Sequence, residues 1–109
     1  MVGKVKINFA SGKLEKILSN ERLIYRYFCV ADAKKIMARM SEFDAAENLE
    51  QISTNPPPLR HKLIGNKKDQ WGVWYSPNDR FVIQPSGCFD INDLRSITEI
   101  TIIKLGDYH

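Results

Sequence analysis

Three consecutive prolines, Pro56 to Pro58, divide this chain into two parts of different character. Proline fixes its backbone φ and lacks an amide N–H, so a helix cannot continue through it. Before the prolines, apolar residues recur mainly at helical spacing, and after them the segments have strand character. The sequence therefore predicts an α+β protein whose helical layer comes from residues 11–53 and whose sheet comes mostly from the region after Pro58.

The first part opens with residues 4–9, where polar and apolar side chains alternate as in a half-buried strand. Ser11 can cap a helix because its hydroxyl can accept a bond from the unpaired N–H groups of the first turn. Residues 23–28 are dense in apolar side chains, and their helical extent stays ambiguous. Helical spacing is clear from Asp32 onward, and Met37 and Met40 in this segment are interpreted as core filler. The same period predicts a third, short helix through Phe43, Ala46, Leu49 and Ile52.

The second part predicts a β-hairpin, because two strand-like runs, 71–76 and 80–84, flank the turn sequence Pro-Asn-Asp. Side chains alternate along a strand, so Trp71, Val73 and Tyr75 share one face and should lie in the core. A helical turn is possible between residues 89 and 96, and residues 97–105 form the last predicted strand. The expected architecture is two layers, with two or three helices on one face of a twisted antiparallel sheet of about four strands.

The 109 residues fit a single domain, 1–109, with one core. No apolar run is long enough to cross a bilayer, and the first residues do not resemble a signal peptide, so a cytoplasmic protein is expected. Cys29 and Cys88 are predicted to be buried free thiols, since a disulfide would suit an exported protein.

Basic residues exceed acidic ones by 16 to 13, which gives a formal charge of +3. The distribution of these charges is more informative, since six basic residues or histidines follow a stretch rich in Glu and Asp: Arg60, His61, Lys62, Lys67, Lys68 and Arg80. One end of the domain should therefore be basic and should favour a polyanion.

The chain ends in Asp107-Tyr108-His109, directly after the last predicted strand. RNA cleavage without a metal needs a base for the 2′-hydroxyl, an acid for the departing 5′-oxygen and cations for the phosphate. Residues of the right types for these roles are present in the chain: His61, His109, Tyr108, Asp107, Arg80 and the lysines 62, 67 and 68. Trp74 points away from the core face and could stack on a base or pack against a partner protein.

Other interpretations of these residues remain open at this point. Either histidine could be an ordinary surface residue, and lysines most often form a solvated face. A zinc site of His61, His109 and Asp107 is conceivable, although paired cysteines and helical ligand spacing are absent.

The order of several short motifs resembles HigB-type toxins of toxin–antitoxin systems, which belong to the RelE superfamily of small endoribonucleases. The motifs that carry the resemblance are the run from Ala31 to Arg39, then Ala46 and Leu49, Pro57-Pro58, His61-x-Leu63-x-Gly65, Gln70-Trp71, Asn78-Asp79-Arg80-Phe81 and the terminal Asp107-Tyr108-His109. The resemblance covers roughly residues 30–109, and the predicted N-terminal strand and helix fit the layout of the same family.

The resemblance implies a RelE-like fold and cleavage of messenger RNA in the ribosomal A site, by 2′-oxygen attack that leaves a cyclic phosphate. It implies no cofactor. The implied partners are a HigA-type helix-turn-helix antitoxin, the ribosome and messenger RNA, with operator DNA contacted only through the antitoxin and no membrane contact. Carried over by position, the implied catalytic residues are His61, Arg80, Asp107, Tyr108 and His109, and the RNA-binding candidates are Arg60, Lys62, Lys67, Lys68 and Trp74.

Three departures from the family pattern leave a second function open. Ile64 replaces the usual lysine, Asn66-Lys67 replaces an acidic–basic pair, and the connection from Gly87 to Ile97 is longer than usual. A nearby lysine could compensate for Ile64. The alternative is a weak or inert homologue that acts mainly as an antitoxin-binding partner and co-repressor of its operon.

Overall fold

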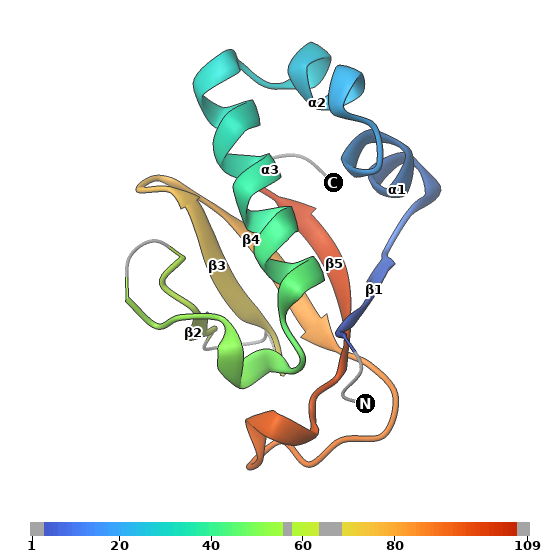
Figure 1. The fold of residues 1–109 in the computed structure, drawn as a ribbon, viewed down its shortest axis with the longest axis vertical. Helices are drawn as coiled ribbons and strands as arrows, with labels where there is room; N and C mark the ends of the chain where they lie inside the picture. The colour runs from blue at the N-terminus through green and yellow to red at the C-terminus, as the bar shows by residue number, and fades with distance from the viewer. Residues whose placement is uncertain (1–3, 56–57, 64–68, 107–109) are drawn as a thin grey trace.

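The computed structural model describes residues 4–55, 58–63 and 69–106. Within these ranges, three α-helices pack on one face of a five-stranded sheet (Figure 1). The elements, in chain order, are β1 (Lys6–Phe9), α1 (Gly12–Leu18), α2 (Glu21–Tyr27), α3 (Val30–Ala45), the 3₁₀ turn η1 (Leu49–Gln51), β2 (His61–Lys62), β3 (Trp71–Ser76), β4 (Asp79–Pro85), the 3₁₀ turn η2 (Leu94–Ser96) and β5 (Glu99–Leu105).

The first two helices begin at side-chain caps. The Ser11 hydroxyl accepts a hydrogen bond of 3.1 Å from the N–H of Leu14, as the sequence predicted for α1. Asn20 caps α2 in the same way, with a bond of 3.0 Å from the N–H of Arg22, so the ambiguous segment 23–28 is largely helical. In the part of the chain that the structure describes, no helix is both long and apolar enough to span a membrane.

The predicted third helix through Phe43, Ala46, Leu49 and Ile52 is only a 3₁₀ turn. Phe43 belongs to α3, which ends at Ala45, and Ala46 is extended with φ −74° and ψ 148°. The Ala46 carbonyl accepts a bond of 2.8 Å from the N–H of Val5, and Leu49 donates one of 3.0 Å to the carbonyl of Ile97. These bonds to distant segments replace the bonds that would have continued the helix.

The sheet is mixed, in the order β1-β5-β4-β3-β2, so the predicted antiparallel sheet of about four strands was wrong in two respects. β1 pairs parallel to β5, with Ile7 opposite Ile100, whereas the other pairs are antiparallel. The fifth strand is the two-residue β2, which pairs only with the beginning of β3. The predicted hairpin of β3 and β4 is confirmed.

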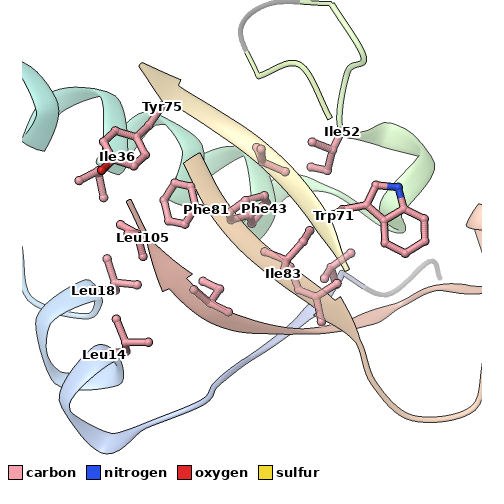
Figure 2. Close-up of a cluster of buried hydrophobic side chains, with 14 of the residues drawn as sticks. Leu14, Leu18, Ile36, Phe43, Ile52, Trp71, Tyr75, Phe81, Ile83 and Leu105 are labelled. Carbon is pink, nitrogen blue, oxygen red and sulfur yellow. The ribbon is translucent and has the colours of Figure 1, made fainter. Parts of the chain in front are cut away.

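The core lies between the helices and the inner face of the sheet (Figure 2). Phe81 is fully buried and meets Phe43 of α3 and Tyr75 of β3 edge to face, with ring centroids 5.2 and 5.6 Å apart. Trp71 and Val73 are buried on the same face, as predicted. Because alternate residues of β3 fill this core, the residues between them lie on the outer face of the sheet, away from the helices.

Both cysteines are free but exposed, so the prediction of two buried thiols was wrong. Cys29 lies at the corner between α2 and α3, and Cys88 follows β4 in a loop. Neither cysteine belongs to the hydrophobic core that the described residues form.

Candidate nucleic-acid interface

Gly72 is the point on the outer face of the sheet where two candidate residues meet. It lies opposite His61 on β2 and opposite Val82 on β4, while its neighbour Trp74 lies opposite Arg80. A Cβ atom on Gly72 would lie 2.7 Å from His61 Cε1, 2.8 Å from His61 Nε2 and 2.9 Å from Arg80 Cδ. The imidazole and the arginine side chain therefore share the space that the missing side chain leaves.

The His61 ring is fixed by a backbone carbonyl. Its Nδ1 atom lies 2.9 Å from the carbonyl oxygen of Leu59. A carbonyl oxygen can only accept, so Nδ1 carries the hydrogen, and Nε2 of the neutral ring keeps its lone pair. Leu59 itself has a φ of 47°, a left-handed conformation that is uncommon for leucine and costs backbone strain. The resulting turn aims the Leu59 carbonyl at the ring, so Nε2 is left for chemistry on the outer face.

A cavity of about 310 Å³ lies on the outer face near the β3–β4 turn. Its lining combines cationic, carboxylate, amide and aromatic groups around the nearly buried Val82: Trp74, Pro77, Asn78, Asp79, Arg80, Val82, Lys104 and Gly106. Arg80 joins the two regions, because its Cδ lies over Gly72 and its side chain also lines the cavity. Among the described residues, neither Arg80 nor Lys104 has an ion-pair partner. The two cations are thus available to a phosphate group.

Lys104 is a residue that sequence reasoning missed, and a β-bulge explains why. Simple alternation along β5 would place Lys104 on the same face as the buried Ile100 and Ile102. The register between β4 and β5 shifts at Val82/Ile83, so that Ile83 faces Ile102 but Val82 faces Lys104. The one extra residue, Ile103, turns Lys104 to the outer face. A lysine inside an apolar strand was the available signal, but the register shift is seen only in the pairing of β5 with β4.

Two of the predicted RNA-binding residues do not join this group. Lys62 pairs with Trp71, and its Nζ lies 5.5 Å from the Trp71 ring centroid, so it lies on the helix side of the sheet. Arg60 donates from Nε to the carbonyl of Ile52 at 2.8 Å, beside η1. Burial lowers the pKa of the Arg60 guanidinium from its ordinary value, and Glu50 offsets part of that shift. Both side chains therefore leave the face that His61 occupies.

The remaining predicted site residues lie outside the described residues: Lys67, Lys68, Asp107, Tyr108 and His109, together with Ile64. Their implied roles in catalysis and RNA binding stay predictions. Over the ranges that the structure does describe, no group of three or more His, Cys, Asp or Glu residues is placed to hold a metal ion.

Comparison with known proteins gives a likeness in structure but none in sequence. No family model and no curated protein matches the chain. Among solved structures, a chain of the YoeB-YefM complex from Staphylococcus aureus is similar, with a TM-score of 0.56 and 13% sequence identity, over 98% of this chain and 100% of that chain. A likeness at this identity concerns the fold alone.

Proposed function

We propose that this chain is the toxin of a type II toxin–antitoxin system and an endoribonuclease that cleaves messenger RNA in the ribosomal A site. The observation that carries the proposal is the meeting of His61 and Arg80 over Gly72 on a RelE-like sheet. Those two positions are among the five that the resemblance to HigB-type toxins assigns to catalysis. The proposed protein acts in the cytoplasm and needs no cofactor.

The chemistry divides between proton transfer and charge stabilisation. A base takes the proton of the ribose 2′-hydroxyl, and the 2′-oxygen forms a bond to phosphorus as the bond from phosphorus to the 5′-oxygen breaks. The departing 5′-oxygen receives a proton from an acid, which leaves a 2′,3′-cyclic phosphate and a 5′-hydroxyl. We assign one proton transfer to His61 Nε2 and the other to the terminal Asp107, Tyr108 and His109, as the resemblance implies.

Cations on the outer face would stabilise the phosphate as its charge develops. Arg80 suits this role because its planar guanidinium can hold two phosphate oxygens. Lys104 lines the same cavity and is proposed to supply the charge that Ile64 lacks. The partly buried Trp74 offers a ring on which a base could stack. The ribosome would hold the messenger in cleavable geometry, so a small number of protein contacts would suffice.

Induced expression tests the proposal. We expect the chain alone to arrest growth and translation, and a HigA-type antitoxin encoded beside it to restore both. His61→Gln and His109→Ala should each lower cleavage on ribosomes by about two to four orders of magnitude, the usual cost of losing an acid or base. Primer extension on messenger from arrested cells would locate the cuts. Growth arrest without cuts, or unchanged cutting by both variants, would contradict the assignment.

Ile64 favours the second function, an inert homologue that binds the antitoxin and represses their operon. In that case, the chain should bind the antitoxin and strengthen its binding to operator DNA without arresting growth. Ile64→Lys should then create or raise the cleavage activity. A gel-shift assay with the operator, run beside the cleavage assay, separates the two functions.

A further inference from the structure

A second cavity lies on the other side of Trp74, between α3 and the end of β3. Its volume is about 370 Å³, near the lower end of the roughly 300–1,000 Å³ range of ligand pockets. The walls are mainly apolar and the rim is basic: Lys34, Lys35, Ala38, Arg39, Trp74, Tyr75, Ser76 and Pro77. It has room for one or two side chains, and the proposed catalytic chemistry makes no use of it.

The charges around this cavity are unbalanced. Lys34 and Lys35 are exposed on the first half of α3, and neither has an ion-pair partner among the described residues. Arg39 is 9% exposed and pairs with Glu42 through Nη2 at 2.6 Å. Its buried Nε has no hydrogen-bond partner within the described part of the chain. A buried polar group without a partner costs free energy, so an incoming acceptor beside Arg39 would be favoured.

The walls favour a protein side chain over a nucleotide. Tyr75 is 4% exposed and packs on Phe81, so its ring face is not open for stacking. The Ser76 hydroxyl already donates to Asp79 at 3.3 Å, which leaves few groups to read the edge of a base. An aliphatic or aromatic side chain would bury apolar area against Ala38 and Pro77 without needing polar partners.

We propose that the cavity is a docking site for an acidic segment of a partner protein, which inserts one large apolar side chain between α3 and β3 and sets its carboxylates against Lys34, Lys35 and Arg39. Trp74 and Pro77 line both this cavity and the one that contains Arg80. An occupant would therefore press on the wall of the proposed RNA site. The inference stands on the cavity alone and does not depend on the proposed ribonuclease activity.

Acetylated hexapeptides test the docking site on the full chain. The probes are DELFED and DELWED, with DEGSED lacking both apolar residues and KKLFKK reversing the charge. The readout is the indole N–H signal of Trp74 in a ¹H–¹⁵N spectrum, assigned with Trp74→Phe and compared with the signal of the buried Trp71. We expect a saturable shift of the Trp74 signal with the two acidic apolar peptides and no shift with the two controls.

Matched variants distinguish the cavity from the general surface. Ala38→Phe should fill the cavity and weaken binding of DELFED at least tenfold, whereas Ala31→Phe, at another exposed position of α3, should not. Lys34→Glu with Lys35→Glu should also weaken binding, and Lys4→Glu with Lys16→Glu should leave it within about threefold, with the same net charge. All four positions that change charge are exposed, so the fold is not at risk.

Three results would overturn the proposal. One is the absence of any shift with both acidic apolar peptides, and another is equal binding by DEGSED. The third concerns RNA: if oligouridylate shifts the Trp74 signal and Ala38→Phe removes that shift, the cavity belongs to nucleic acid. The peptide titration does not depend on ribonuclease activity. A chain that fails to cleave RNA could still bind the acidic peptides, so the cleavage assay and the titration test the two proposals separately.

Discussion

Gly72 leaves open the space in which His61 and Arg80 meet, so a single methyl group tests the site at the residue scale. In Gly72→Ala the new Cβ would lie within 3 Å of both side chains and displace them. Alanine suits a strand better than glycine, so the fold should survive with a change in stability of about 1 kcal/mol or less. RNA cleavage should fall at least tenfold in a ribosome assay, while thermal unfolding stays nearly the same. Gly12→Ala is the control, because a Cβ there meets nothing within 4 Å; equal activity of the two variants would refute the shared space.

At the scale of the element, α1 begins at a side-chain cap whose contribution to the free energy of unfolding can be measured. Ser11→Ala removes the acceptor for the Leu14 N–H, and the loss of such a cap typically costs about 0.5–2 kcal/mol. We expect a lower urea midpoint with an unchanged slope, since the unfolded surface stays the same. Ser41→Ala, at an exposed position inside α3, should change stability by about 0.5 kcal/mol or less. A Ser11 variant as stable as the Ser41 variant would mean that packing of Leu14 and Ile17 alone fixes the helix.

At the scale of the whole molecule, the two faces of the sheet carry different basic residues, and only those of the outer face are expected to contact RNA phosphates. Arg80 and Lys104 lie on the outer face, whereas Lys62 lies beside Trp71 on the helix side. Each phosphate contact on a single strand contributes about −0.7 to the slope of log K against log salt. Lys104→Gln should therefore weaken binding of a short single-stranded RNA and flatten that slope by about this amount. Lys62→Gln makes the same change in net charge and should leave the slope unaltered. If Lys62→Gln flattens the slope and Lys104→Gln does not, then Lys62, and not Lys104, supplies the charge that Ile64 lacks.

The sequence by itself determined the features that depend on neighbours within a few residues. Ser11 begins α1, and the alternation in 71–76 sets which side chains of β3 are buried. These follow from local backbone limits and from the periods of helix and strand.

Only the tertiary structure decided the pairing of distant segments. β1 enters the sheet parallel to β5, where Asn8 donates to Glu99 at 2.7 Å across most of the chain length. The bulge that turns Lys104 outward depends on the register against β4, and Gly72 brings together His61 and Arg80 from two other strands. A one-residue shift in register moves a side chain to the opposite face, and no pattern within one strand records which register its neighbour takes. His61, Arg80 and Trp74 could therefore be named from the sequence, but Lys104 and the role of Gly72 could not.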